Sequence, residues 1–328
     1  MTISDIAKMA GVSSAAVSRY FNNGYLSDEK KEAIRRVVEV TGYRPSIQAQ
    51  MLRTKKTRTI GVMIPKVDSS SMGRILAGIY SVLDDSGYRV LMAVSRNDTR
   101  KELEYLTVFD ESQVDGIIMS GTIFSATHRK AMKKVNVPLV VVGQQIAGFN
   151  CVFHDDYHAS YELTRRFLDA GRMNPGYIGV TEKDRAVGEM RYKGYCDAVK
   201  DAGLMECRGN YITADFTINS GYEKMGELMA IHPDLDAVVC ATDRIAIGAQ
   251  KWAQEHDFRV PQQLIIGGHG DSDMAALATP PISTIHYHYE ESGAVAARRL
   301  LELLNEEAAN TRGATKEVQL GFELINRV

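Results

Sequence analysis

Apolar and polar positions at the start of the chain recur with the spacing of short helices. Ile6 and Ala10 share one face of a first helix, and Val17 and Phe21 share one face of a second. Gly11 lies between them and adopts the left-handed conformation that a tight turn requires without a Cβ clash. This pattern predicts two short helices that cross at a glycine turn.

Capping residues support these helices and predict a third. Thr2 is placed to cap the first helix together with Asp5, and Ser13 is placed to cap the second. Ser27 precedes a longer amphipathic segment and is expected to cap it, and Gly42 is expected to end it. Three helices of this size can close a small apolar core.

The outer face of the second helix is small or polar, as a surface that enters a DNA groove requires. Its residues are Ser14, Ala15, Ser18, Arg19 and Asn22. Arg19 is the best candidate for reading a base, because a guanidinium can donate to two acceptors on the edge of a guanine. Two amphipathic helices also occur as ordinary packing units, so the pattern alone leaves a helix-turn-helix as one of two interpretations.

Charge is distributed unevenly along the chain. Residues 1–58 contain eleven Lys and Arg against five Asp and Glu, whereas the remainder contains 28 basic and 36 acidic residues. The overall net charge of −2 hides this asymmetry. A basic head on an acidic body indicates a protein that binds a polyanion with one end.

From residue 59 onwards, short apolar runs alternate with helical segments. Seven such runs are evident, and they read TIGVMIP, YRVLMAVS, DGIIMS, PLVVVG, GYIGV, DAVVC and LIIGG. This rhythm predicts an α/β fold with parallel sheets covered on both faces. A break near residues 150–157 divides the runs into two groups, which indicates two doubly wound lobes with a ligand cleft at the carboxyl ends of their strands.

Polar side chains follow several of these strands. The candidates for lining the cleft are Asp68, Ser69, Ser70, Ser120, Thr122, Gln144, Gln145, Thr242 and Asp243, with Phe153 and Phe216 as aromatic surfaces for stacking. Hydroxyl, amide and carboxylate groups suit a polyhydroxylated ligand, because each sugar hydroxyl needs a partner once it leaves water. Loop polar groups also satisfy nearby backbone, and aromatic rings also fill cores, so each residue has a purely structural alternative.

The head, the linker and the two lobes together resemble the lactose repressor (LacI) family over the whole chain. The resemblance implies a helix-turn-helix head over residues 1–45 and a hinge helix and linker over residues 46–58. It implies a two-lobed effector-binding and dimerisation domain, like a periplasmic binding protein, over residues 59–328. The first lobe is expected to span about 59–156 plus 287–313, and the second about 157–284 plus 316–328.

The same resemblance assigns roles in DNA binding. It places base contacts on Ser14, Ala15 and Arg19, phosphate contacts on Ser13, Ser18 and Asn22, and a minor-groove wedge on Leu52. Ala16 stands where other members often carry a hydroxyl, so one phosphate contact of the family has no matching side chain here. The hinge segment of about two turns is too short to be stable alone, so it is expected to fold only with support.

Within the cleft, the resemblance matches Arg191 to an arginine that grips ligand hydroxyls and Phe216 to an aromatic lining residue. The family usually has a ligand-binding aspartate after a late strand, whereas this chain has His269 there. His269 can bond a hydroxyl, recognise an anion or serve as a buried structural residue, and Asp271 can replace the carboxylate.

Catalytic and metal-binding patterns are weak. The sequence contains no GxSxG elbow and no GxxxxGK phosphate loop, and GGHG at residues 267–270 lacks dinucleotide spacing. His286 and His288, considered together with His154 and His158 as metal ligands, share a strand face but have no evident third donor. The four cysteines (Cys151, Cys196, Cys207, Cys240) have no metal spacing. We therefore expect no enzyme activity, no cofactor and no metal.

These features predict a cytoplasmic transcriptional repressor that binds a palindromic double-stranded operator as a homodimer and is released by a small saccharide. The resemblance to the family favours sucrose or other glucosyl and fructosyl sugars as that saccharide. The start MTISDIAKM is not a signal peptide and no long apolar run exists, so no membrane partner is expected. The alternatives are a solute-binding receptor of similar two-lobed fold, an enzyme on a doubly wound fold, and a corepressor-dependent regulator that responds to a phosphosugar or purine-like effector.

Overall fold

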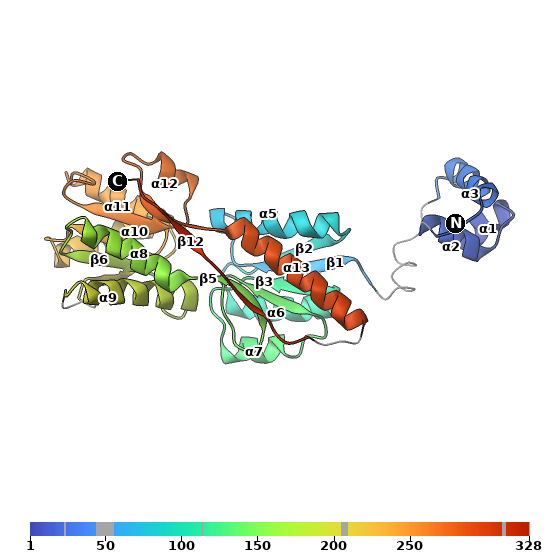
Figure 1. Ribbon diagram of the computed structural model, residues 1–328, viewed down its shortest axis with the longest axis horizontal. Coiled ribbons are helices and arrows are strands. Elements are labelled where there is room, and N and C mark those ends of the chain that lie inside the picture. The colour runs from blue at the N-terminus through green and yellow to red at the C-terminus, as the bar shows by residue number, and fades with distance from the viewer. Residues whose placement is uncertain (23, 44–55, 113, 205–208, 310–312, 328) are drawn as a thin grey trace. The chain divides into compact units, whose positions relative to one another are not determined.

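A computed structural model describes residues 1–22, 24–43, 56–112, 114–204, 209–309 and 313–327. The chain forms two compact units, Met1–Thr57 and Arg58–Val328 (Figure 1). No helix in the described part of the chain is long and apolar enough to cross a bilayer.

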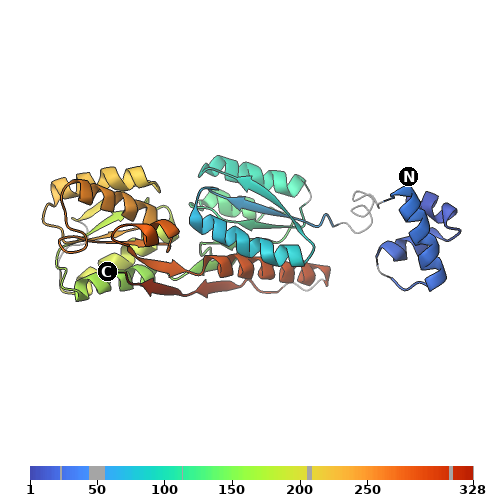
Figure 2. The same ribbon diagram turned by 90° about the horizontal axis from the view of Figure 1, so that it is seen from above.

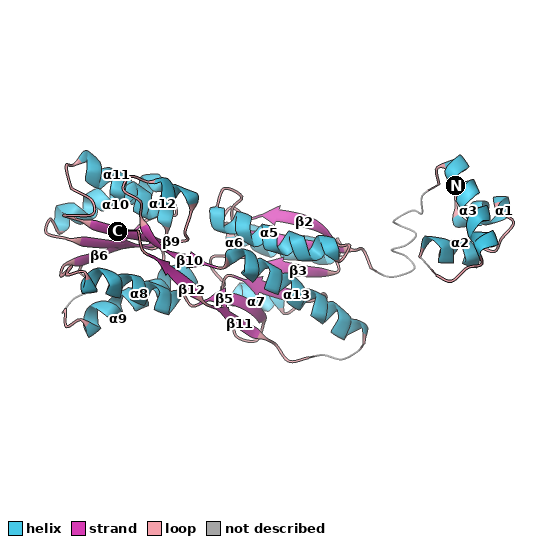
Figure 3. Cartoon of the chain, turned by 45° about the horizontal axis from the view of Figure 1, so that its top comes forward, coloured by secondary structure: helices cyan, strands magenta, loops and turns pink. Residues whose placement is uncertain are grey.

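The first unit is a small bundle of three helices, drawn in Figure 3. They are α1 (Ile3–Met9), α2 (Ser14–Phe21) and α3 (Asp28–Thr41). Ile6, Val17 and Ile34, one from each helix, are fully buried and form its core. The predicted inner faces of the first two helices are therefore confirmed.

The ends of these helices agree with the sequence in all but one case. Thr2 and Asp5 form a reciprocal capping box, and the Ser13 hydroxyl accepts from the amide of Ala16 at 3.2 Å. Gly11 and Gly42 have positive φ angles of 63° and 61°. Ser27 occupies the expected position before α3 but its side chain makes no capping hydrogen bond, so that prediction was wrong.

The first lobe of the second unit is built on a parallel sheet with the order β11-β5-β4-β3-β1-β2. Its strands are β1 (Thr59–Ile64), β2 (Arg89–Val94), β3 (Gly116–Met119), β4 (Leu139–Val142), β5 (Asn150–His154) and β11 (Glu317–Leu320). One apolar layer joins the sheet to α5 (Ser70–Asp85) and α13 (Tyr289–Ala308), which run side by side in Figure 2. The opposite layer joins it to α6 (Thr99–Glu111) and α7 (Ala126–Met132).

The second lobe repeats this design with the strand order β12-β10-β9-β8-β6-β7. Its strands are β6 (Pro175–Gly179), β7 (Tyr211–Thr213), β8 (Ala237–Cys240), β9 (Ile265–His269), β10 (Ser283–Tyr287) and the antiparallel β12 (Phe322–Ile325). Two helix layers cover the sheet (Figure 1): α8 (Asp156–Asp169) packs with α9 (Arg191–Asp201), and α10 (Ile218–Ile231) packs with α11 (Asp243–Glu255). A π-helix, η1 (Arg185–Met190), precedes α9, and the short α12 (Asp273–Leu277) follows β9. The predicted α/β class with two doubly wound lobes is confirmed.

The chain crosses between the lobes three times, after β5, β10 and β11. The expected lobe boundaries placed residues 316–328 with the second lobe. However, β11 pairs with β5 of the first sheet, with Glu317 opposite Cys151, and Val318 packs against the first core. Residues up to Leu320 therefore belong to the first lobe. The predicted boundary was wrong because the local sequence pattern does not show that β5 has an edge free for pairing.

Candidate functional site

The predicted DNA-reading face of α2 is accessible. Ser14, Ala15 and Arg19 are exposed, whereas Ala16 is buried in the head and offers no side chain to a phosphate. Gly24 lies close against the aliphatic part of Arg19, and its amide donates to the Arg19 carbonyl at 2.8 Å. Arg19 itself is exposed, so the residue is accessible to a DNA groove.

The other predicted DNA contacts have different surroundings. Ser18 is half-buried and Asn22 is exposed, and Nδ2 of Asn22 donates to the Ser18 carbonyl at 2.5 Å. The Ser13 hydroxyl is already an acceptor for the helix cap, which leaves its own proton for a phosphate. Leu52 and the hinge segment 46–53 lie outside the described residues, so their roles stay predictions.

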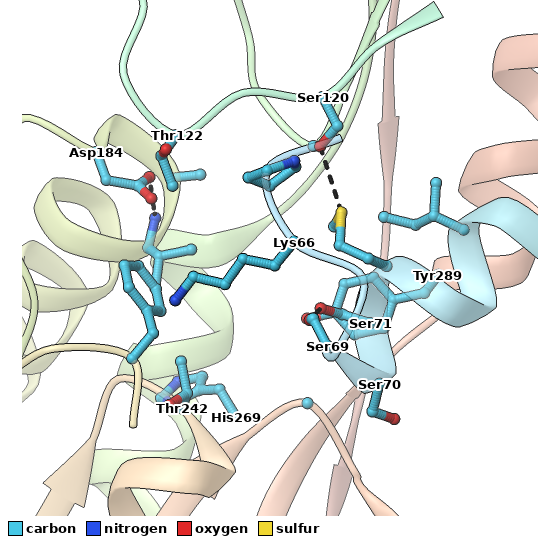
Figure 4. Close-up of a pocket in the computed structure, with 18 of the residues that line it drawn as sticks. Lys66, Ser69, Ser70, Ser71, Ser120, Thr122, Asp184, Thr242, His269 and Tyr289 are labelled. Atoms are coloured by element: carbon cyan, nitrogen blue, oxygen red, sulfur yellow. Dashed lines mark hydrogen bonds between the residues drawn. The ribbon is translucent and has the colours of Figure 1, made fainter. Parts of the chain in front are cut away.

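The principal cavity of the second unit lies between the lobes, where the carboxyl ends of strands from both sheets converge (Figure 4). It brings together most of the predicted residues, namely Ser69, Ser70, Ser120, Thr122, Gln144, Arg191, Phe216, Thr242, Asp243 and His269. Asp68 and Phe153 do not line it. The Asp68 backbone and side chain contact Arg244 at the rim, and Phe153 with Gln145 lines a second, adjoining pocket.

Several contacts join the lobes across this cleft. Gln144 of the first lobe donates to Asp184 of the second at 2.9 Å, and Arg244 donates to the Asp68 carbonyl at 2.9 Å. Arg74 also donates to the carbonyl of Gly270. The lobes are therefore held together by polar pairs at several points around the cavity.

Lys66 adds a positive charge to the interior of the cleft. Its ammonium lies 5.5 Å from the centre of the Phe216 ring, which belongs to the other lobe. Phe216 thus lines the cleft as predicted, with a cation on its face in the structure.

Asp184 is an unusual carboxyl group in this site. It caps η1 by accepting from the amide of Val187 at 3.1 Å, and the same oxygen accepts from Gln144. Burial raises the pKa of Asp184 to about 7, against the effect of these hydrogen bonds and of Arg191. Protonation of this group near neutral pH is thus linked to a contact between the lobes.

Arg191 lines the cleft, and most of its guanidinium nitrogens already bind other groups of the protein. Its Nε donates to Oδ1 of Asp156 at 2.7 Å, and its Nη2 lies 2.7 Å from the same oxygen in an ion pair. Its Nη1 donates to the Ala241 carbonyl at 2.6 Å. The guanidinium also lies 4.7 Å from the centre of the Tyr287 ring. Burial opposes the charge, but Tyr287 and Asp156 raise the pKa of Arg191 well above its ordinary value. Arg191 therefore has a structural role that the sequence did not reveal, and its contact with a ligand stays a prediction.

The carboxylate of Asp243 also binds other groups of the protein. Its two carboxylate oxygens accept from the Thr284 hydroxyl at 2.5 Å and the Ser272 amide at 2.6 Å, and burial raises its pKa. These bonds tie the first turn of α11 to β10 and to the start of α12. Asp243 consequently lines the cavity as an anchor for its wall.

His269 stands at the end of β9 and is only 2 % exposed. Its Nδ1 lies 2.8 Å from the carbonyl oxygen of Cys240, and no hydrogen-bond partner for Nε2 is found among the described residues. Burial, with the nearby charge of Arg191, lowers the pKa of His269 well below its ordinary value. Burial therefore favours the neutral form of this imidazole.

Asp271 does not replace the expected cleft aspartate. Its oxygens contact His286 at 2.8 Å and Arg327 at 2.5 Å, and it is not part of the cavity lining. Burial works against its charge, but the bonds from Arg327 and His286 lower the pKa of Asp271. That alternative is excluded because the carboxylate is committed to another surface of the second lobe.

The histidines considered as metal ligands have carboxylate partners. His286 faces Asp271, and His288 lies 3.8 Å from Glu323. Over the described ranges, no three His, Cys, Asp or Glu side chains come together in a group that fits a metal ion.

Sequence reasoning missed several cleft residues, including Lys66, Arg74, His154, Asp184 and Tyr289. His154 and Tyr289 belong to crossovers between the lobes, one at the end of β5 and one at the start of α13. β5 was not among the seven predicted apolar runs, and the strand assumed at His286 was considered only for metal binding. Since neither His154 nor Tyr289 follows one of the predicted apolar runs, the pattern of polar residues after such runs did not predict them.

Comparison with known proteins agrees with both units. Residues 2–46 match the lacI family of bacterial regulatory proteins, and residues 164–327 match a periplasmic binding protein-like domain. The sucrose operon repressor of Staphylococcus xylosus is 31% identical over 98% of this chain and 99% of its own length, and catabolite control protein A of Priestia megaterium is 31% identical over 95% of each. A lac repressor dimer bound to operator and the anti-inducer ONPF has the same fold, with a TM-score of 0.89 and 20% identity over 100% of this chain and 98% of that one. The chain therefore belongs to the lacI family of DNA-binding bacterial transcriptional regulators.

Proposed function

We propose that this regulator is a cytoplasmic repressor of sugar-utilisation genes that leaves a palindromic operator when a small saccharide binds its cleft. The observation that carries the proposal is the cavity itself, which presents hydroxyl groups from both lobes and amide groups from the first lobe. Ser69, Ser70 and Thr122 are among these groups, and Phe216 adds an apolar ring. Such a lining suits a ligand with many hydroxyls. The sucrose operon repressor of Staphylococcus xylosus is a relative over nearly the full length of the chain.

DNA binding is assigned to the outer face of α2. Ser14, Ala15 and Arg19 read bases, and Ser13, Ser18 and Asn22 hold phosphates, while Leu52 wedges into the minor groove. The exposure of Arg19 and the small side chains before it support close approach to a groove. A homodimer places two heads on the two half-sites of a palindrome.

Release follows from a change in the relation of the lobes. A saccharide in the cleft changes the stability of the polar pairs that join the lobes, such as Gln144 with Asp184 and Arg244 with Asp68. A lobe arrangement favoured by ligand shifts the population away from the one that pairs the two hinges on DNA. Loss of the hinge helix predicted for residues 46–53, which lie outside the described residues, then lowers operator affinity.

The test is binding of the full-length protein to DNA from upstream of its gene, followed by fluorescence anisotropy. Neutral sugars, sugar phosphates and purines are added one at a time, and sedimentation gives the oligomeric state. We expect one neutral sugar to release a dimer from the fragment. Tighter binding on addition of an effector contradicts the inducer mechanism and indicates a corepressor, and a monomer on operator contradicts the dimer.

A further inference from the structure

The second pocket opens next to the principal cavity, where β5 and β11 end. It has a volume of about 150 Å³, which is enough for one six-membered ring. Both lobes supply its lining, with Phe153 and Gln319 from the first lobe and Arg185 and Met190 from the second. Four residues line both cavities, and they are Gln144, His154, Asp156 and Ala186. The pocket therefore lies between the lobes, beside the cleft.

The wall from the first lobe combines an aromatic ring with a carboxamide. Phe153 and Gln319 are register partners on the parallel strands β5 and β11, so their side chains leave the same face of the sheet. Phe153 is half-buried and packs against the apolar core, whereas Gln319 is exposed. The half-buried thioether of Met190 adds a second apolar group from the other lobe. A flat ring in the pocket can therefore lie against Phe153 while a polar substituent meets an amide.

Arg185 gives this pocket a positive charge without an acidic partner. The side chain is exposed, and its Nη1 donates across the lobes to the Gln145 carbonyl at 3.3 Å. No Asp or Glu pairs with Arg185 among the residues that the structure describes. The planar guanidinium has further donors, and their spacing fits the two oxygens of a carboxylate or phosphate.

The two acids that line the pocket do not neutralise this arginine. Asp156 forms its ion pair with Arg191. Both oxygens of Asp155 contact His158, one at 3.1 Å from the backbone amide and the other at 2.8 Å from Nδ1. The charge that remains available in the pocket is therefore positive, and the group that complements it is an anion.

We infer that this pocket is a second ligand site, for a small organic anion that consists of one ring and one carboxylate or phosphate group. The anionic group pairs with Arg185 of the second lobe, and the ring lies against Phe153 of the first. A ligand that contacts both lobes favours the arrangement in which the pocket is formed. Arg185 also directly follows Asp184, which caps η1 and accepts from Gln144. The inference goes beyond the proposed function, which places a saccharide in the principal cavity.

The experiment is fluorine NMR on the full-length protein without DNA, in a buffer free of phosphate and carboxylate. The probes share one ring and differ in charge: para-fluorobenzoate, para-fluorophenyl phosphate and the neutral para-fluorobenzamide. We expect at least one of the two anions to bind with a dissociation constant of about 1 mM or below, and the amide to bind about tenfold more weakly. The comparison of benzoate with phenyl phosphate identifies which anionic group the site prefers.

Four variants locate the bound probe. Arg185→Gln should weaken binding of the anion about five- to twentyfold, and Gln319→Glu, which places a negative charge on the opposite lobe, about three- to tenfold. Lys183→Gln is the matched control, because it removes an exposed charge two positions from Arg185 and outside both cavities. Lys66→Gln removes a cation of the principal cavity. Neither Lys183→Gln nor Lys66→Gln should change binding of the anion.

Three results overturn the inference. The first is no saturable binding of either anion up to about 10 mM. The second is binding of the benzamide as tight as that of the anions, which removes the role of charge. The third is an equal loss in Lys66→Gln and Arg185→Gln, which places the probe in the principal cavity. None of these measurements uses operator or sugar, so their outcome is independent of the proposed release by a saccharide.

Discussion

Gln144 and Asp184 connect the two lobes across the cleft, with Nε2 of Gln144 donating to a carboxylate oxygen of Asp184 at 2.9 Å. The same nitrogen donates to the Thr122 carbonyl at 2.7 Å, so the amide is fixed to the first lobe before it reaches the second. Asp184 in turn caps η1, which leads directly into α9 and Arg191. One hydrogen bond therefore links the ends of strands in the first lobe to the floor of the cleft in the second.

This link makes stability depend on pH through Asp184. Its pKa is raised to about 7 in the folded protein from an ordinary value of 3.8, so between these values the folded state holds a proton that the unfolded state releases. The contribution of Asp184 to stability is therefore lost as the pH rises through this range. Asp184→Asn removes the titration and keeps an acceptor for Gln144 and Val187.

We expect the melting temperature of Asp184→Asn, relative to that of the wild type, to increase from pH 5 to pH 8. Thermal unfolding in a series of buffers of equal ionic strength measures this difference. A difference that is constant with pH would show that the carboxyl has an ordinary pKa in the folded protein.

Removal of Arg191 should destabilise the second unit severely. Arg191→Ala leaves the buried carboxylate of Asp156 without its cation, a change that costs about 3–5 kcal/mol. Urea unfolding of the full-length protein measures the loss. The double variant Asp156→Asn with Arg191→Met removes both charges and should be more stable than Arg191→Ala, and additive losses would argue against a coupled pair.

The packing of α5 against α13 depends on a glycine. A Cβ at Gly78 would clash with the carbonyl of Glu290, and Gly293 meets Ile75 in the same way from the opposite helix. We expect Gly78→Ala to lower the free energy of unfolding by about 3 kcal/mol, because backbone cannot move aside as a side chain can. Urea unfolding is again the measurement.

Gly73 of the same helix is the matched control. Apart from the neighbouring backbone of α5 itself, no atom lies within 4 Å of a Cβ placed there. Gly73→Ala should therefore stabilise the protein by up to about 1 kcal/mol through its helix propensity. Equal effects of the two substitutions would mean that α5 and α13 are not in close contact.

The caps of the head helices differ in a way that hydrogen exchange can detect. Ser13→Ala removes the side-chain acceptor for the Ala16 amide and should weaken α2 by about 1 kcal/mol. Ser27→Ala removes no capping hydrogen bond and should leave the protection of α3 nearly unchanged. A larger effect of Ser27→Ala than of Ser13→Ala would contradict the observed cap geometry.

Arg19 should matter for operator binding and not for folding. Arg19→Ala removes an exposed guanidinium and is expected to weaken operator affinity by about 1–3 kcal/mol, with a smaller loss on a site whose contacted guanine is replaced. Anisotropy titrations on the two fragments at one salt concentration give both numbers. Arg35→Ala on α3, which removes a pair with Glu32, is the control for a general loss of positive charge.

The sequence was sufficient for the features that depend on neighbouring residues. The inner faces of α1 and α2, the caps at Thr2 and Ser13 and the turn glycines all follow from spacings of a few positions. The βαβ rhythm likewise predicted two parallel sheets. Ser27 shows the limit even here, because a capping residue in the right position still needs the right side-chain geometry.

Contacts between distant segments were decided only by the tertiary structure. Three contacts join positions far apart in the chain. They are the pairing of β11 with β5, the ion pair of Arg191 with Asp156 and the ion pair of Asp271 with Arg327. An arginine or aspartate carries no local signal for its partner, because the choice depends on which charged groups the packed strands bring within hydrogen-bond distance. The sequence by itself thus determined the head helices, the strands with a local apolar run and the location of the cleft. The folded packing determined the remaining strand pairings and which polar side chains of the cleft remain available to a ligand.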